Sequence, residues 1–116
     1  MAFGILPAHI PGAVRARILQ LGSRLREHPL VEKVILYGSF AVGTYGADSD
    51  IDIAVFLPAG NDCGLTVYRE LSRLIGGNGY DIQIQVFSID ELSDPCGIVE
   101  EIVEHGIVLW DKTLNE

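Results

Sequence analysis

The sequence predicts a small domain of the α/β or α+β class, with a mixed β-sheet and helices packed mainly on one face. Helical and strand-like patterns alternate along the chain, and the connections between them are short. A length of 116 residues fits one domain, which we assign to residues 1–116. Hydrophobic residues make up 48% of the chain, which is enough for a core and argues against disorder.

The first half of the chain predicts one helix and two strands. Residues 13–26 carry apolar side chains at helical spacing, with arginines on the other faces; the apolar positions are Val14, Ile18, Leu21 and Leu25. Residues 33–37 (KVILY) predict a short buried strand. Residues 38–49 form either a Gly-rich loop or a short helix followed by a turn. Residues 50–57 (DIDIAVFL) predict a second strand, which Pro58 ends.

The second half of the chain also predicts alternating helices and strands. Residues 65–75 predict a helix that the glycines from Gly76 onward terminate. Residues 80–87 (YDIQIQVF) alternate strictly and predict a strand; its polar face carries Asp81, Gln83 and Gln85. Residues 97–105 predict a last helix, and residues 107–110 (IVLW) a short terminal strand.

Charge and composition exclude several classes of protein. The formal net charge is −8, which argues against direct nucleic-acid binding, because that requires a basic surface. No apolar run approaches the ~20 residues of a membrane span, and no basic leader precedes the first apolar run. We therefore expect a cytoplasmic protein. Cys63 and Cys96 are far apart and outside any Cys/His cluster, so we expect reduced thiols and no zinc site.

Two acids open the second predicted strand. Asp50 and Asp52 are one residue apart, so in a strand they point to the same face, about 7 Å apart. Two such carboxylates repel each other unless a counter-charge lies between them. Hard oxygen ligands of this kind suit Mg²⁺. The alternative is that both acids are solvated side chains at a strand end.

A Gly-Ser turn precedes this acid pair. Gly38 would let the backbone approach a phosphate closely, and Ser39 could offer its N–H and hydroxyl. Ser49, directly before Asp50, is a further candidate for nucleotide binding. The simpler alternatives are a helix cap at residues 38–39 and a strand-end cap at Ser49. Together the turn and the acids indicate a metal-dependent phosphoryl or nucleotidyl transferase.

These motifs resemble those of a known superfamily. GSFAVG at residues 38–43 followed by SDIDIAV at residues 49–55 is similar to the GSxxxG…SDxDxxV signature of the DNA-polymerase-β-like nucleotidyltransferases. Within that superfamily the chain most resembles the minimal nucleotidyltransferase (MNT) domains, which often pair with a HEPN-domain protein as toxin and antitoxin. The resemblance is best over residues 33–57, and it implies a polymerase-β-like nucleotidyltransferase fold.

The resemblance also implies a set of site residues. The two acids of the DxD, Asp50 and Asp52, would hold two Mg²⁺ ions, one of which binds the triphosphate of the nucleotide. A third carboxylate from a neighbouring strand completes the family's site, and Asp81 matches it best. ATP is the implied substrate, with AMP as the transferred group.

One residue departs from the family pattern. Relatives commonly carry Arg, sometimes Lys, at the position of Val42, where it could contact phosphate. Arg69 and Arg73 on the predicted helix 65–75 could replace that charge, although a solvated helix face is the simpler interpretation. Val42 therefore keeps open a second hypothesis, an inactive antitoxin that neutralises its partner by contact alone.

The acceptor of the nucleotide is expected to come from a partner. The larger enzymes of the superfamily carry a helical acceptor-binding domain, and the 116 residues leave nothing over to build one. The resemblance implies a HEPN-type toxin whose hydroxyl side chain receives AMP. A free-standing enzyme acting on a small molecule is the third hypothesis. The sequence leaves open whether the chain forms a homo-oligomer or a hetero-oligomer.

Overall fold

The computed structural model describes residues 2–3, 6, 8–46, 49–60, 64–76 and 81–113. The elements follow one another as β1 (Ala2–Phe3), α1 (Gly12–Leu25), β2 (Lys33–Tyr37), α2 (Ser39–Val42), β3 (Ile51–Leu57), α3 (Gly64–Ile75), β4 (Ile82–Ser88), the 3₁₀ helix η1 (Ile89–Leu92), α4 (Ile98–His105) and β5 (Ile107–Asp111). The predicted fold class is confirmed, and residues 38–49 contain a short helix. Strand β1 and the 3₁₀ helix η1 were not predicted from the sequence.

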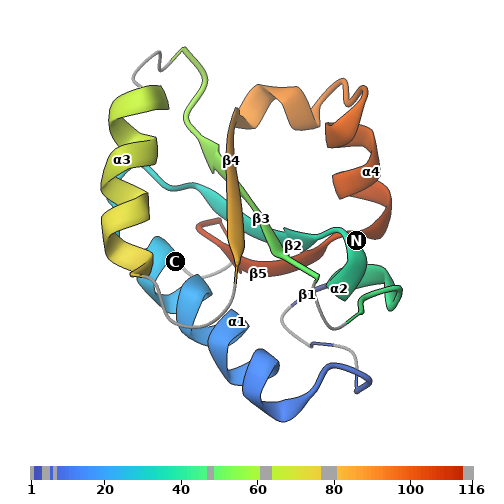
Figure 1. Ribbon diagram of the computed structural model, residues 1–116. Coiled ribbons are helices and arrows are strands. Elements are labelled where there is room, and N and C mark those ends of the chain that lie inside the picture. Colours follow the sequence, from blue (N-terminus) through green and yellow to red (C-terminus); the bar gives the residue numbers. More distant parts are fainter. Residues whose placement is uncertain are drawn as a thin grey trace.

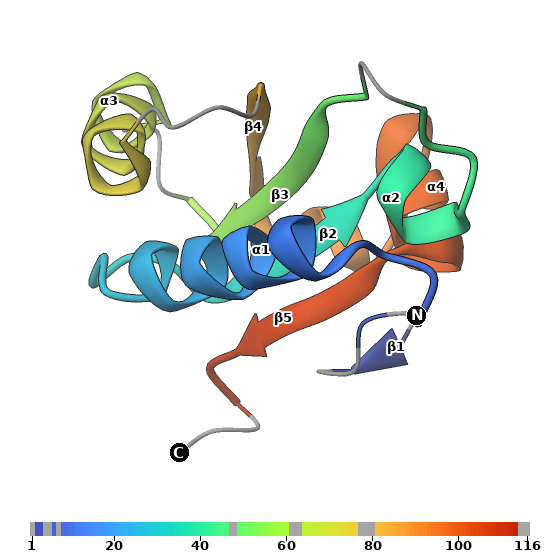
Figure 2. The same cartoon turned by 60° about the horizontal axis from the view of Figure 1, so that its bottom comes forward.

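The strands form one mixed sheet in the order β1-β5-β2-β3-β4. Strand β2 runs antiparallel to both β3 and β5, whereas β3 and β4 are parallel. Parallel neighbours need a crossover connection, which α3 supplies between β3 and β4. Figure 1 shows α3 and α4 on opposite sides of this sheet, and Figure 2 shows α1 lying across it.

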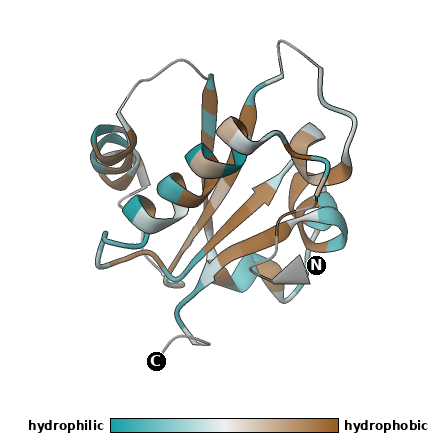
Figure 3. Cartoon of the chain, turned by 90° about the horizontal axis from the view of Figure 1, so that it is seen from below, coloured by the Kyte–Doolittle hydropathy of each residue, from teal (hydrophilic) through white to brown (hydrophobic). Residues whose placement is uncertain are grey.

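Alternation along β3 builds two hydrophobic layers. Ile51, Ile53 and Val55 belong to the core that contains the buried side chains of α1 and α3. Ala54 and Phe56 belong to a second cluster with Ile102 of α4. The longer helices thus cover one face, as predicted, and α4 with η1 covers the other. The central strands are accordingly among the most hydrophobic parts of the chain (Figure 3).

Helix α1 buries all four of its predicted apolar positions and one arginine in addition. Arg17 was expected on an outer face, but it is only 6% exposed. Its Nη2 donates hydrogen bonds to the carbonyl oxygens of Ile75 (2.7 Å) and Gly76 (3.5 Å) at the end of α3. The terminal carbonyls of a helix lack partners within the helix, so Arg17 is buried because it caps α3.

Two further predictions concern membrane-spanning helices and the cysteines. No helix in the described part of the chain is long and apolar enough to cross a membrane. Cys96 is an exposed free thiol, as expected, and Cys63 lies outside the described residues.

Candidate active site

Gly38 brings the turn after β2 into contact with the acid pair. It adopts φ +77°, a left-handed conformation that side-chain-bearing residues rarely take, and it immediately precedes α2. A Cβ at this position would overlap Oδ2 of Asp52 and lie 3.1 Å from its Cγ. Only glycine therefore allows the backbone to lie this close to the Asp52 carboxylate.

The acids lie at the starts of two adjacent strands, β3 and β4, and beside the end of β2. Asp52 pairs with Tyr37 of β2 on one side and with Gln83 of β4 on the other. The N–H of Ile51 donates a 2.8 Å hydrogen bond to the carbonyl of Asp81, which places Asp81 beside the Asp50–Ile51 segment. The predicted triad of Asp50, Asp52 and Asp81 therefore lies at one end of the β3–β4 pair.

Backbone proximity does not bring the three carboxylates into one cluster. Within the described ranges, no three His, Cys, Asp or Glu side chains lie close enough together to hold a single metal ion. Asp50 lies close enough to Asp52 for its charge to raise the pKa of Asp52, whereas the Asp81 side chain is exposed. The role of Asp81 as third ligand stays a prediction.

The electrostatics of Asp52 and Tyr37 show an excess of negative charge. Burial raises the pKa of Asp52, and the carboxylates of Asp50 and Glu101 raise it further. Burial, Asp52 and Glu101 together raise the pKa of Tyr37 to about 12, so its hydroxyl stays protonated at neutral pH. All of these influences disfavour negative charge, and carboxylate oxygens are ligands that Mg²⁺ prefers. The Asp50–Asp52 pair therefore fits a divalent cation chemically.

Glu101 is the site residue that the sequence analysis did not assign to the acid pair. It lies on α4, next to the buried Ile102, and its charge contributes to the raised pKa of both Asp52 and Tyr37. The strand pattern could not place it, because sequence spacing does not say which face of the sheet α4 covers. The alternation along β3 puts Asp52, Ala54 and Phe56 on one face of the sheet. Had α4 been assigned to that face, this pattern would have indicated that Glu101 lies near Asp52.

The two serines have different surroundings. Ser39 begins α2, and its carbonyl accepts hydrogen bonds from the N–H groups of Gly43 (2.9 Å) and Thr44 (3.1 Å). The Ser39 N–H itself has no partner within the helix because it lies in the first turn. Ser49 closes a turn instead, since its Oγ accepts a 2.7 Å bond from the N–H of Gly46. Its predicted contact with nucleotide stays a prediction.

No arginine replaces the cation missing at Val42. Val42 is 45% exposed at the end of α2. Arg69 and Arg73 lie on α3, whose buried side chains join the core on the face away from Asp52. The hypothesis that they substitute for the missing arginine therefore has no support in the fold.

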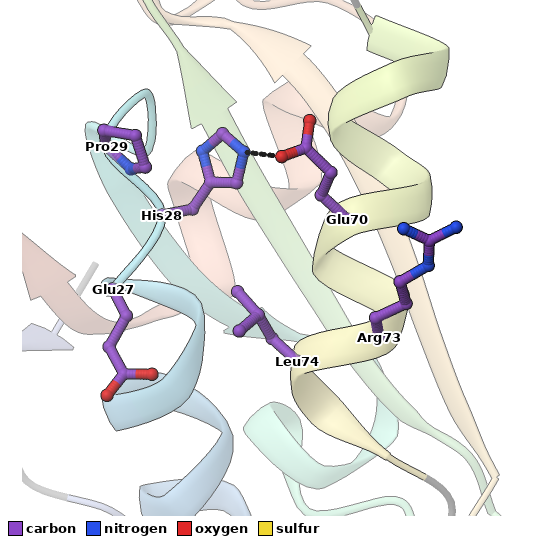
Figure 4. Close-up of a pocket in the computed structure, with 6 residues that line it drawn as sticks. All are labelled: Glu27, His28, Pro29, Glu70, Arg73 and Leu74. Carbon is purple, nitrogen blue, oxygen red and sulfur yellow. Dashed lines mark ion pairs between the residues drawn. The ribbon is translucent and has the colours of Figure 1, made fainter.

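Arg73 instead lines a separate cavity of about 340 Å³, which lies between helix α3 and the loop that follows α1. The other residues that line this cavity are Glu27, His28, Pro29, Glu70 and Leu74. Figure 4 shows Glu70 directed toward the His28 ring, with a Nε2–Oε2 distance of 3.3 Å. This cavity belongs to the layer of α1 and α3, because its lining residue Leu74 packs against the core on that face of the sheet. It is not part of the acid site.

The chain matches one protein family over most of its length. Residues 20–114 match the family described as "Polymerase beta, Nucleotidyltransferase". The chain belongs to this nucleotidyltransferase family. Members of the family typically use Mg²⁺ and a nucleoside triphosphate. No curated protein sequence matches the chain.

Three solved structures are similar to the chain, and the first of them shows the same fold. A protein from Sulfolobus solfataricus named as a nucleotidyltransferase is 24% identical, with a TM-score of 0.60, covering 91% of this chain and 93% of its own. A toxin–antitoxin complex with AMP-PNP matches at 24% identity and TM-score 0.49, over 86% of this chain and 75% of its own. A complex of an MNT antitoxin with a tri-AMPylated HEPN toxin from Shewanella oneidensis matches at 19% identity and a TM-score of 0.49. The match covers 87% of this chain and 75% of its own.

Proposed function

We propose that this nucleotidyltransferase transfers AMP from ATP to a hydroxyl side chain of a HEPN-type partner protein and thereby acts as its antitoxin. The observation that carries the proposal is the contact between Gly38 and the carboxylate of Asp52, beside Asp50. That contact brings the turn at the start of α2, where the Ser39 N–H has no partner within the helix, against the carboxylate of Asp52. Triphosphate recognition needs both parts side by side.

The chain's own residues have separate tasks in this proposal. Asp50 and Asp52 bind Mg²⁺, which in this chemistry neutralises charge on the triphosphate. Ser39 donates its N–H and hydroxyl to phosphate oxygens. Asp81, at the start of the neighbouring strand, orients the acceptor hydroxyl and completes metal binding. Tyr37 stays protonated and can donate a hydrogen bond to the acid pair.

The partner part of the proposal rests on surface chemistry. The segment between Arg73 and Lys112 contains no lysine or arginine; its acids are Asp81, Asp90, Glu91, Asp94, Glu100, Glu101, Glu104 and Asp111. Helix α4 buries Val99 and Ile102 and leaves Ile98 39% exposed among these acids. An exposed apolar side chain with an acidic rim suits a basic protein surface.

Intact-mass spectrometry tests the transfer directly. The chain, a HEPN-type protein, ATP and Mg²⁺ are incubated together, and we expect the partner's mass to rise by one or more AMP units. Asp50→Asn with Asp52→Asn should abolish the shift and metal-dependent ATP binding, whereas Asp81→Asn should retain ATP binding and lose transfer. An unchanged partner mass with the native chain would reject the transferase proposal.

The second candidate is an antitoxin that acts by contact alone. The exposed Val42, at the position where relatives carry a basic residue, favours it because the described part of the site then offers no arginine to the triphosphate. A tight complex without any mass change would support this candidate. The absence of any complex would remove both candidates.

A further inference from the structure

Strand β4 is the last strand of the sheet, and half of its backbone groups point outward. The N–H of Ile51 donates to the carbonyl of Asp81, while Ile51 pairs in register with Ile82. In a parallel ladder each residue bonds to the two residues that flank its partner, so the odd-numbered residues of β4 bond to β3. The N–H and C=O groups of the even-numbered residues point away from the sheet; these residues are Ile82, Ile84, Val86 and Ser88.

This outer edge of β4 is open in the described part of the chain. The N–H of Ser88 donates a 2.8 Å hydrogen bond to Oε2 of Glu91, which ends the edge at η1. No described residue bonds to the outer groups of Ile82, Ile84 or Val86. Lysine, proline or a bulge usually protects such an edge from pairing. Strand β4 contains no charged residue and no proline, and its register with β3 is continuous.

Helix α3 places two exposed apolar side chains beside this edge. The helix packs against both α1 and β4 (Figure 1). Glu70 and Leu74 line the cavity next to the loop after α1, so they mark the side of α3 that faces α1. At 3.6 residues per turn, Tyr68 lies about 200° around the helix from Glu70. Leu65 lies about 180° from Leu74 by the same geometry. Leu65 (66% exposed) and Tyr68 (43% exposed) are therefore on the side toward the β4 edge.

The charge of the chain limits which protein can pair with this edge surface, which consists of the outer edge of β4 with Leu65 and Tyr68. With a net charge of −8, two copies of the chain repel each other through their acidic surfaces. The edge surface contains no charged residue, so a second copy can approach there without like charges in contact.

The edge is also complementary to itself. In an antiparallel pair with Ile84 on the two-fold axis, Ile82 lies opposite Val86 of the other copy, and all three sets of free outer groups bond. The same register places the exposed Gln83 opposite Gln85 of the other copy, where the side-chain amides can bond to each other.

We infer that β4 pairs with β4 of a second copy in antiparallel orientation and joins the two sheets into one. The two-fold axis is perpendicular to the sheet, so the same faces of the two sheets lie side by side. Leu65 and Tyr68 of the two copies then meet in the layer of α3. This inference goes beyond the proposed function, because it requires neither metal nor nucleotide.

Hydrogen exchange at several protein concentrations tests the strand pairing. The amides of Ile84 and Val86 should exchange about tenfold more slowly when the concentration rises from well below to well above the dissociation constant of the dimer. The amides of Gln83 and Gln85 are the internal control, because their bonds to β3 form in the single copy. Their exchange should depend much less on concentration. Equal concentration dependence of all four amides would overturn the pairing.

Sedimentation equilibrium of charge variants tests the register and the partner. Gln83→Lys with Gln85→Lys places like charges opposite each other and should raise the dissociation constant by about tenfold. Gln83→Glu with Gln85→Glu should do the same, and an equimolar mixture of the two variants should dimerise again. Ala16→Lys with Leu19→Lys is the matched control, because it makes the same charge change at exposed positions on α1. It should leave the dimer intact.

The same measurements show what would overturn the inference. A native chain that stays monomeric up to about 1 mM has no such dimer. A dimer that the α1 variant dissolves and the β4 variants leave intact would place the interface on α1. Protection of the edge amides only after a HEPN-type protein is added would make that protein the occupant instead of a second copy. Melting temperatures near the native value, together with recovery in the mixture, would show that the β4 variants lose the dimer without unfolding.

Discussion

At the scale of single residues, Gly38 links backbone conformation to site chemistry. Its left-handed φ and its contact with Asp52 are separate reasons for glycine, and each excludes a side chain. Gly60 offers a comparison, because it has a similar φ of +79° but nothing within 4 Å of its Cβ position. The two glycines therefore share a positive φ and differ in the contact with the acid.

Replacing these glycines separates strain from contact. Gly60→Ala should lower the free energy of unfolding by about 1–2 kcal/mol, the strain of a left-handed residue. Gly38→Ala should lower it further and weaken binding of ATP with Mg²⁺, because the new methyl group displaces the Asp52 carboxylate. Chemical denaturation and calorimetry measure the two effects. Identical losses of stability and unchanged binding would show that the Asp52 contact has no role.

Part of the site could be predicted at this scale and part could not. Gly38, Asp50 and Asp52 follow from local spacing, since a turn and a period of two place them without knowledge of the rest of the fold. The position of Glu101 relative to the acids depends on which face of the sheet α4 covers. That face is set by contacts between segments far apart in the sequence. Ser49 shows the limit of a motif, because the same residue that precedes the DxD also closes a local turn through Gly46.

At the scale of elements, a hydrogen-bonded contact between α1 and α3 sets how the two long helices meet. Arg17 and Arg24 of α1 both donate to the carbonyl of Ile75, at 2.7 Å and 3.5 Å. Arg17 is buried, whereas Arg24 is partly exposed. Helical periodicity predicted the apolar face of α1 correctly. It could not reveal the open carbonyls of α3 that draw Arg17 inward, because they belong to a different element.

Removing these two caps should have unequal effects. Arg17→Met keeps the apolar stem and loses a short charged hydrogen bond, so we expect a loss of about 2 kcal/mol in unfolding free energy. Arg24→Met removes a longer bond from a partly exposed side chain and should change stability by less than about 0.5 kcal/mol. Urea denaturation of the two variants provides the comparison. Equal losses would mean that Arg17 contributes through packing and not as a cap.

At the scale of the whole molecule, the two faces of the sheet differ in charge. Every arginine belongs to the layer of α1 and α3, whereas the acids of η1 and α4 lie on the face that also carries Asp52. The mixed sheet itself was predictable from alternating helix and strand patterns. The strand order was not, because the placement of β5 beside β2, with α4 on the second face, depends on pairing between distant segments. The charge segregation therefore emerges only from the assembled fold.

This segregation predicts how the chain meets a basic partner. Glu104→Lys on α4 and Glu27→Lys beside α1 make the same change in net charge on opposite faces, and both side chains are exposed. If the partner docks on the acidic face, Glu104→Lys should slow association with the HEPN-type protein by about tenfold and reduce its salt dependence. Glu27→Lys should leave the rate nearly unchanged. Stopped-flow association at low and high salt measures both, and equal slowing by the two variants would place the docking surface elsewhere.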